Sequence, residues 1–293
     1  MTAIPQLIAS SLLLGGVYGL MSIGLTLIFG VMRVVNFAHG EYLMLGMYLA
    51  FWAFARYGLD PYLSLVVALP AFFVLGTLTY LLIMRGIINT SHVVQIFTTV
   101  GLSVALQNLA LVLWTGDFRF VRPAAADVTV RLAGAAFNLS QLIAFGVAMV
   151  VTLALFAFLR WTHLGLVLRA TAQDREAATL MGVNTDLAHG LAFTLGIVCV
   201  GVAGVLAAPQ FPVYPTAGLQ FVLIAYVVVV LGGLGNMVGA LIGSLIVATV
   251  EVVGGFVIGT AWKEVLYFLI FIAVLLFRPA GLFGQRGAEN LGA

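Results

Sequence analysis

Polar side chains interrupt the first apolar stretch of the chain at a spacing that could serve binding or catalysis. Arg33, Asn36, His39 and Glu41 fall within nine consecutive residues between two apolar segments. A neighbouring His and Glu could act as a catalytic or metal-binding pair. The chain, however, has no HExxH sequence, no paired-Asp motif and no Ser–His setting that would support an enzyme. Groups of this kind at a helix break can instead satisfy freed backbone groups, pair with each other or line a path between helices.

Nucleotide chemistry is excluded by the single lysine. Lys263 is followed by Glu264 and has no glycine-rich stretch before it, so no GxxxxGK[ST] phosphate-binding loop can form. If the protein works with ATP, another subunit must bind it. The single cysteine, Cys199, has no partner within the chain, and a net charge of +2 is too small and too scattered for nucleic-acid binding. We expect no cofactor and no resident metal.

The composition indicates a membrane protein. Of the 293 residues, 63% are hydrophobic and 8% are charged, a balance that a water-soluble domain could not cover with polar surface. Residues 1–32 carry no charged side chain and exceed the apolar core of a signal peptide. The first segment is therefore predicted to remain as a membrane helix.

The charge-free intervals predict an all-α, polytopic bundle in one domain, residues 1–293, with about eight to ten spans. Some of these segments could be broken or re-entrant helices. Between the last segments, the prolines of PQFPVYP and the glycines of LGGLGN separate one crossing from the next. The nine predicted segments are 1–32, 42–56, 61–84, 86–116, 132–159, 187–208, 218–232, 237–256 and 264–277.

Basic residues give only a weak indication of orientation. With the polar segment 160–186 in the cytoplasm, seven basic residues are inside and five outside, in the direction of the positive-inside rule. The inner set is Arg33, Arg85, Arg160, Arg169, Arg175, Arg278 and Arg286, and the outer set is Arg56, Arg119, Arg122, Arg131 and Lys263.

The longest polar interruption between spans is LGLVLRATAQDREAATLMGVNTD, residues 164–186. It predicts a short surface helix over 168–181 that ends at Gly182 in a left-handed cap. Such a helix can lodge in a groove on a soluble partner and transmit rigid-body motion, whereas the alternative is an ordinary solvated loop. Its apolar side would hold Leu168, Ala172, Leu180 and Met181, and its polar side Asp174, Arg175 and Glu176.

This segment resembles a known family. Glu176-Ala177-Ala178 followed by Gly182 matches the EAA–G pattern by which permeases of ATP-binding-cassette importers engage their ATPase subunits, and AQDREAATLMGVN is similar to the version typical of branched-chain amino-acid permeases. The stretch GLTLIFGVMRVVNFAHGEYLMLGMYLA, residues 24–50, resembles the first signature of the same family. The resemblance implies that the residues that contact the ATPase are Arg169, Gln173, Asp174, Arg175, Glu176, Ala177, Ala178, Leu180, Gly182 and Val183.

A glycine-rich stretch carries the third match. VVLGGLGNMVGALIGSLIVATVE, residues 229–251, is similar to the GGxGxxxGxxxG element of that family. Gly235, Gly239 and Gly243 recur every four residues, which places them along one helix face and lets another helix approach closely. The alternative is a broken helix, around Gly232 and Gly233, that faces the substrate.

Several polar residues inside the spans are candidates for either packing or transport. His92, Gln95, Gln107 and Asn108 are interpreted as bonding between helices. Glu251 would be an intramembrane carboxylate, which is costly unless it is paired or wetted. For the cluster at 33–41 a tight turn, with Arg33 and Glu41 reaching the lipid headgroups, remains the alternative to a transport path. The candidate path residues are Asn36, His39, Gly40, Glu41, Gly232, Gly233, Gly235 and Glu251.

The resemblance covers most of the chain and implies the permease subunit of an importer in a bacterial inner membrane, without catalytic residues of its own. It implies cytoplasmic ATP-binding subunits, a periplasmic or extracellular substrate-binding protein and a second, different permease, although the residues themselves leave open two identical copies. The substrate would be a branched-chain or other hydrophobic amino acid, with urea, short amides or aromatic acids as alternatives within the family. The rival from another class is a secondary transporter or channel that works without an ATPase, and it would move substrate alone in liposomes.

Overall fold

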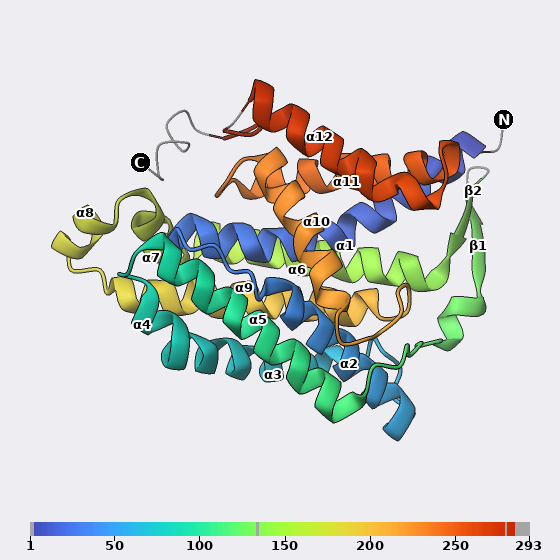
Figure 1. Cartoon of the computed structure of the whole chain (residues 1–293), viewed down its shortest axis with the longest axis horizontal. Coiled ribbons are helices and arrows are strands. Elements are labelled where there is room, and N and C mark those ends of the chain that lie inside the picture. Colours follow the sequence, from blue (N-terminus) through green and yellow to red (C-terminus); the bar gives the residue numbers. More distant parts are fainter. Residues whose placement is uncertain (1–2, 133–134, 279, 285–293) are drawn as a thin grey trace.

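Long helices that run roughly side by side make up most of the molecule (Figure 1). The computed structural model describes residues 3–132, 135–278 and 280–284, so the predicted inner residue Arg286 lies outside the described residues. The longer helices are α1 (Ala3–Met32), α2 (His39–Tyr57), α3 (Leu65–Thr79), α5 (His92–Trp114), α6 (Leu139–Trp161), α7 (His163–Gln173), α8 (Arg175–Leu180), α9 (Thr185–Ala207), α10 (Ala217–Gly232), α11 (Met237–Val257) and α12 (Lys263–Phe277).

Short elements join these helices. A π-helical turn, Tyr80–Met84, continues α3 into the one-turn α4 (Arg85–Ile87), and 3-10 turns lie at Ala124–Asp127 and Thr260–Trp262. Two antiparallel strands, β1 (Thr129–Leu132) and β2 (Ala135–Asn138), precede α6. The all-α prediction missed this hairpin, and the span predicted at 132–159 begins seven residues too early, because β2 occupies its first part and Asn138 caps α6.

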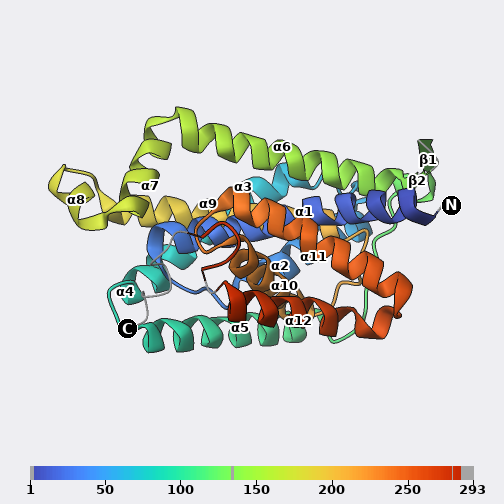
Figure 2. The ribbon, with the colours of Figure 1, turned by 90° about the horizontal axis from the view of Figure 1, so that it is seen from above.

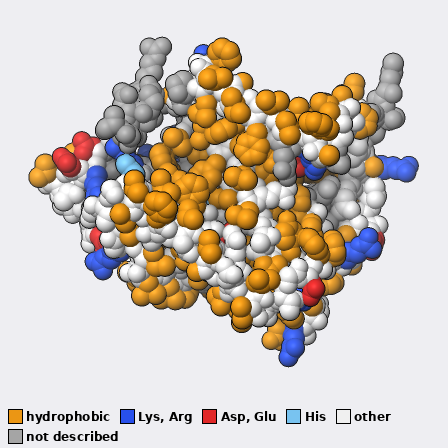
Figure 3. Space-filling view, viewed as in Figure 1, with side chains coloured by type: hydrophobic (Ala, Val, Ile, Leu, Met, Phe, Trp, Pro, Cys, Tyr) orange, Lys and Arg blue, Asp and Glu red, His pale blue; other side chains and the backbone are white. Residues whose placement is uncertain are grey.

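Each of the nine apolar segments predicted from the sequence contains a helix. Within the described residues, six helical stretches are long and apolar enough to cross a membrane, and α10 and α12 are shorter apolar helices. On the face drawn in Figure 3, hydrophobic side chains cover the middle, and charged side chains gather toward the two ends and the lower edge. The six stretches are Ile4–Met32, Leu65–Ile87, His92–Trp114, Leu139–Trp161, Thr185–Ala207 and Met237–Val257.

Helices α1 and α9 form the centre of the bundle. Their most apolar windows are 83% and 78% buried, against 17% for α5, so α1 and α9 carry the packing while α5 lies at an edge. Figure 2 shows α6 at one margin and α5 with α12 at the other, with α1 and α9 between them. Glycine makes the central contact possible: a Cβ on Gly24 of α1 would lie 2.6 Å from the carbonyl oxygen of Gly196 on α9.

Helix α2 packs on α9 by the same means. A Cβ on Gly204 of α9 would lie 2.1 Å from the carbonyl oxygen of Leu43, and a Cβ on Gly46 would lie 2.3 Å from the carbonyl oxygen of Gly201. No side chain fits between these backbones. In lipid, where apolar surface gains little from burial against another helix, such close approach is a main source of packing energy.

The two ends of the bundle differ in character. Helices α4, α7 and α8 lie together at one end, and the hairpin and the N-terminal part of α1 lie at the other (Figure 1). At the first end Arg85 forms a salt bridge of 3.0 Å with Asp186 at the start of α9. Toward the second end the segment between α5 and α6 meets the segment between α9 and α10, because Arg119 and Val213 form an antiparallel β-bridge. Arg85 of the predicted inner set and Arg119 of the predicted outer set therefore lie toward opposite ends of the bundle.

The Gly204 contact generates a stability prediction. Replacing Gly204 by Ala forces a Cβ into the backbone of α2, and we expect a loss of roughly 1–3 kcal/mol, typical of overpacking. Gly146→Ala on α6 is the matched control, since a Cβ there meets nothing within 4 Å. It should leave stability unchanged or raise it by about 0.5–1 kcal/mol through helix propensity. Thermal unfolding of the detergent-purified variants measures both, and equal midpoints would contradict the packing account.

Candidate functional site

The polar cluster at residues 33–41 forms the joint between α1 and α2. Arg33 ends α1 with a φ of 55°, a left-handed conformation that is uncommon for a residue other than glycine and indicates local strain. The side-chain oxygen of Asn36 accepts a hydrogen bond of 3.1 Å from the amide of Ala38, just before α2 begins. His39 reaches back from α2, and its Nε2 lies 3.0 Å from the carbonyl oxygen of Met21. The joint is thus built by its own polar side chains.

Glu41 lies inside the bundle rather than at a headgroup. Glu41 is fully buried in the first turn of α2, whereas Arg33 is exposed. The expectation that Glu41 reaches the membrane surface is therefore wrong, because α2 starts at His39 and turns Glu41 inward against α5 and α10. Of the two charged residues in the tight-turn alternative, Arg33 is exposed as that alternative requires, and Glu41 is not.

Two neutral donors hold the Glu41 carboxylate. Ser103 Oγ and Gln107 Nε2, one turn apart on α5, donate to Glu41 Oε1 at 3.1 and 2.8 Å. The second oxygen, Oε2, has no hydrogen-bond partner among the described residues, and no Lys or Arg there forms a salt bridge with this carboxylate. A buried carboxylate without a cation is costly, which marks a position where a ligand or water can supply the missing partner.

Helix α10 closes the site from the third side. A Cβ on Gly40 would lie 2.0 Å from the carbonyl oxygen of Gly218, and a Cβ on Gly218 would lie 2.5 Å from Glu41 Oε2. Tyr226, further along α10, packs its ring against Phe37 at 5.3 Å between centroids. Three helices therefore meet at Glu41, and their distance apart is set by glycine.

Further unpaired polar atoms surround the same joint. Asn36 Nδ2, His39 Nδ1 and the Tyr226 hydroxyl are buried, and each lacks a hydrogen-bond partner among the described residues. Buried polar atoms are nearly always bonded to protein or to ordered water. Three such atoms thus lie at the joint from which Glu41 projects.

The glycine-rich turn has a structural role. Helix α10 ends at Gly232, and Gly233 and Gly235 adopt φ values of 104° and 81°, which only glycine reaches without strain. The prediction that Gly235 lies on a helix face is wrong, because α11 begins at Met237 with Asn236 as its cap. Gly239 does lie on the packing face, because a Cβ added there would be 2.1 Å from the carbonyl oxygen of Gly232.

The carbonyl groups at the end of α10 accept hydrogen bonds from amides of the chain itself. The amides of Leu282 and Phe283 donate to the carbonyl oxygens of Leu231 and Gly232 at 2.8 and 3.2 Å. The helix is therefore broken at Gly232–Gly235, as the alternative expected, and that it faces the substrate stays a prediction.

Glu251 has partners, as an intramembrane carboxylate requires. It is 5% exposed on α11, accepts a hydrogen bond of 2.9 Å from the Tyr18 hydroxyl on α1, and forms a salt bridge of 3.2 Å with Lys263 of α12. Three helices are joined through this one side chain. Its geometry is that of a structural ion pair.

The amides of α5 divide into two kinds. Gln107 bonds across to α2, so its interpretation as an interhelical bond is confirmed. Asn108 donates to the Val104 carbonyl of its own helix, and Gln95 donates to the carbonyl groups of residues 87, 88 and 90 at the end of α4. Ser103 was missed by sequence reasoning, although its spacing of four from Gln107 could have indicated a shared polar face.

The polar segment 164–186 forms two helices instead of one. The single helix predicted over 168–181 is wrong, because Asp174 adopts an extended conformation with φ −152° and its side chain caps α8 at the amide of Ala177. The predicted apolar side is also divided: Leu168 of α7 is buried, whereas Leu180 and Met181 are 87% and 84% exposed. Gly182, with φ 82°, confirms the predicted left-handed cap.

Helices α7 and α8 differ in their surroundings. Helix α7 packs against α1, α6 and α9, while α8 projects from the end of the bundle (Figure 1). Leu180 and Met181 are thus left uncovered by the rest of the described chain. Of the residues expected to contact an ATPase, Ala178 is buried and Val183 half-buried, and the exposed ones are Arg169, Gln173, Asp174, Arg175, Glu176, Ala177, Leu180 and Gly182.

Comparisons with known proteins agree with this architecture. Residues 7–275 match the family described as the permease component of the branched-chain amino acid transport system. The chain is 30% identical to the high-affinity branched-chain amino acid transport system permease protein BraD of Pseudomonas aeruginosa, over 98% of this chain and 97% of that protein. It is 31% identical to the high-affinity branched-chain amino acid transport system permease protein LivH of Escherichia coli K12, over 95% of this chain and 94% of that protein.

A more distant similarity reaches a transporter of another ligand. The chain is 28% identical to the autoinducer 2 import system permease protein LsrC of Escherichia coli O9:H4, over 62% of this chain and 54% of that protein. No solved structure matches the chain.

The Glu251 ion pair generates a second prediction. Lys263→Met leaves a buried carboxylate with the Tyr18 hydroxyl alone, and we expect a loss of roughly 1–3 kcal/mol in stability. Adding Glu251→Gln removes the charge, so the double variant should recover much of that loss. Thermal unfolding of the single and double variants in detergent is the measurement. A double variant that is no more stable than Lys263→Met would show that the pair does not hold these helices.

Proposed function

The chain belongs to the family of permease components of branched-chain amino-acid transport systems, and from this premise we propose that it carries branched-chain or other hydrophobic amino acids inward across the inner membrane. As a member of that family it is a multi-pass membrane permease of an ABC transporter and not an enzyme. The observation that supports the substrate class is the buried Glu41 side chain, whose Oε2 has no hydrogen-bond partner and which forms no salt bridge within the described residues.

The ammonium group of an amino acid would complete the Glu41 site. Ser103 and Gln107 hold one carboxylate oxygen, which leaves Oε2 directed to Gly218 of α10. A passing ammonium could replace the missing counter-charge after a small separation of α10 from α2. Apolar side chains of the substrate would meet helix walls that carry few charges. Asn36, His39 and Gly40 belong to this proposed path because they form the joint from which Glu41 projects.

Coupling to ATP hydrolysis is proposed for α8. Its exposed residues Arg175, Glu176, Leu180 and Met181 combine charge with apolar surface, as a helix that enters a groove on a soluble protein does. A second permease would complete the membrane unit, and cytoplasmic ATP-binding subunits would bind the two projecting helices. Conformational change then follows from the different affinities of ligand and nucleotide for the two states.

The outer face offers a surface for a substrate-binding protein. The Arg119–Val213 bridge joins the segment between α5 and α6 to the segment between α9 and α10. Beside it the Phe118 and Tyr214 rings meet at a tilt of 53°, and the Arg119 guanidinium lies over the Phe51 and Trp52 rings of α2 at 5.2 Å. The surface is thus tied to the helix that carries Glu41, so a docked protein could influence the site.

Other ligands of the family remain a second candidate. The similarity to a permease named for autoinducer 2 import supports the view that related chains serve ligands other than branched-chain amino acids. Urea and short amides have no ammonium group, so they would not need the charge of Glu41. Variants of this residue therefore separate the two substrate classes.

The Glu41 prediction follows from that difference. Glu41→Gln keeps the size of the side chain and removes its charge, so uptake of leucine should fall by about tenfold or more, the effect of losing roughly 1.4 kcal/mol. Thermal stability should be unchanged or higher, since a buried charge is lost. Asn108→Ala, which removes a bond within α5 only, is the control. Leucine uptake at the wild-type rate in Glu41→Gln would refute the ammonium site.

The coupling prediction concerns Glu176. Glu176→Lys reverses one charge on α8, and we expect uptake to fall at least about tenfold and the ATPase subunits to be lost on purification, as for a central contact of an interface. Asp127→Lys is the control, because it makes the same kind of charge reversal near the opposite end of the bundle. Cells that co-express the partner subunits provide the uptake assay, with membrane insertion checked by immunoblot. Normal uptake and co-purification in Glu176→Lys would exclude α8 from coupling and favour transport without an ATPase.

A further inference from the structure

A hollow lined by three arginines lies beside the end of α1. Its volume is about 1040 Å³, and it is bounded by the last turns of α1 and α6, by α7 and by the turn between α10 and α11. Arg33 comes from α1, Arg160 from α6 and Arg169 from α7. Neither Asp nor Glu is among the described residues that line it. The hollow is therefore strongly positive.

The three arginines have no acidic partner in the described part of the chain. The salt bridges found there join other residues. One Arg169 guanidinium nitrogen donates to the backbone carbonyl oxygen of Arg160 at 3.4 Å, which holds the Arg169 side chain against the end of α6, and all three arginines line the same hollow. Like charges held together without an anion repel one another, and a bound anion would remove that repulsion.

Apart from the arginines, the lining holds the uncharged polar residues Thr26, Gln173 and Asn236 and a larger number of apolar side chains. Side chains from four elements surround the arginines, so a ligand here would meet cationic and hydrocarbon groups together. Three guanidinium groups match the geometry of phosphate oxygens, which they bind with two parallel hydrogen bonds. The apolar lining residues include Leu27, Phe156, Leu159, Leu168, Met237 and Val238.

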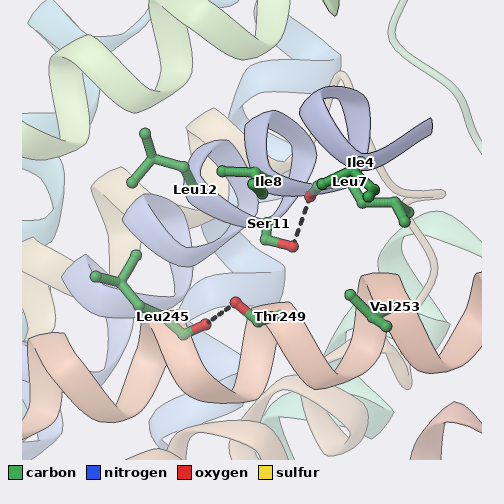
Figure 4. A pocket seen from close by; sticks show the side chains of 8 residues that line it. All are labelled: Ile4, Leu7, Ile8, Ser11, Leu12, Leu245, Thr249 and Val253. Atoms are coloured by element: carbon green, nitrogen blue, oxygen red, sulfur yellow. Dashed lines mark hydrogen bonds between the residues drawn. The ribbon is translucent and has the colours of Figure 1, made fainter. Parts of the chain in front are cut away.

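A second hollow on α1 lacks these features. Near the N-terminal end of α1, a cavity of about 420 Å³ lies between this helix and α11, lined by Ile4, Leu7, Ile8, Ser11, Leu12, Leu245, Thr249 and Val253 (Figure 4). Its two hydroxyl groups, on Ser11 and Thr249, donate to carbonyl oxygens of their own helices. Nothing there could hold a charged group.

We propose that the arginine-lined hollow binds the phosphate of an anionic phospholipid from the cytoplasmic leaflet. The hollow lies at the end of the bundle that carries α7 and α8, where basic pockets between membrane helices meet anionic headgroups. Apolar side chains of α1, α6 and α11 line the hollow, so the hydrocarbon next to a bound headgroup would meet apolar protein surface. A phospholipid supplies both the phosphate and the hydrocarbon that the lining requires.

The position of the hollow connects the lipid to the coupling segment. Leu168, Arg169, Ala172 and Gln173 of α7 line it, and α8 follows directly after α7. A bound phosphate would hold α7 to the ends of α1 and α6. The lipid would thereby keep the base of the projecting helix in place. The binding itself depends on these contacts and not on the transported substrate.

Native mass spectrometry of the full chain in detergent tests the proposal. Phosphatidylglycerol and phosphatidylcholine are added in equal amounts, and we expect the wild type to retain phosphatidylglycerol. The triple variant R33Q/R160Q/R169Q should bind phosphatidylglycerol at least about tenfold more weakly. The control R56Q/R122Q/R131Q removes the same charge from three exposed arginines elsewhere and should bind as the wild type does.

Three results would overturn the proposal. Equal loss in the control variant would show that net charge alone attracts the lipid. Equal retention of phosphatidylcholine would remove the requirement for an anionic headgroup. Inorganic phosphate that occupies the site and excludes phosphatidylglycerol would identify a free anion as the ligand. If the triple variant fails to fold, R160Q against R122Q gives the same comparison. No ATPase is needed, so this outcome is independent of the Glu176 and Glu41 experiments.

Discussion

Backbone contact between helices at glycine is the constraint on which the rest of the structure depends. Lipid tails are as apolar as leucine side chains, so helices in a membrane associate through close packing more than through burial of hydrophobic surface. Gly196 of α9 brings α1 near, and Gly201 and Gly204 do the same for α2. Once α2 is fixed against α9, its first turn faces α5 and α10. The position of Glu41 therefore depends on glycines of α9, a helix distant along the chain from Ser103 and Gln107, which bind its carboxylate.

The two buried carboxylates show how the same residue type serves different purposes. Glu251 has a tyrosine and a lysine within hydrogen-bond distance, so its charge is compensated within the protein. Among the described residues, Glu41 accepts hydrogen bonds from a serine and an amide, which stabilise a carboxylate without neutralising it. A glutamine would fill the same space without the cost of a buried charge. This difference between the two glutamates is the basis of the proposed ammonium site.

Length and composition were sufficient to predict the helices, because an apolar segment in lipid has no other way to satisfy its backbone. The Gly182 cap was also predictable, since a glycine after a helix has one common use. Prediction failed where a single side chain can stabilise either of two local structures. Asp174 can continue a helix or cap the next one, and Asn236 as a cap moved Gly235 out of α11. The Ser103–Glu41 contact and the arginine-lined hollow join distant segments, which spacing along the chain does not reveal.

The division of the coupling segment at Asp174 has a mechanical consequence. Helix α8 touches mainly α7 and the start of α9, while α7 is embedded against α1, α6 and α9. A partner that moves α8 therefore acts through α7 and through the Gly182–Asn184 turn on α9. Helix α9 is the one against which α2 is packed at Gly204, without any intervening side chain that could absorb a displacement. Rigid contacts of this kind transmit small shifts because packed helices slide or rotate as units. The same glycines that position Glu41 thus connect it to the projecting helix at the end of the bundle.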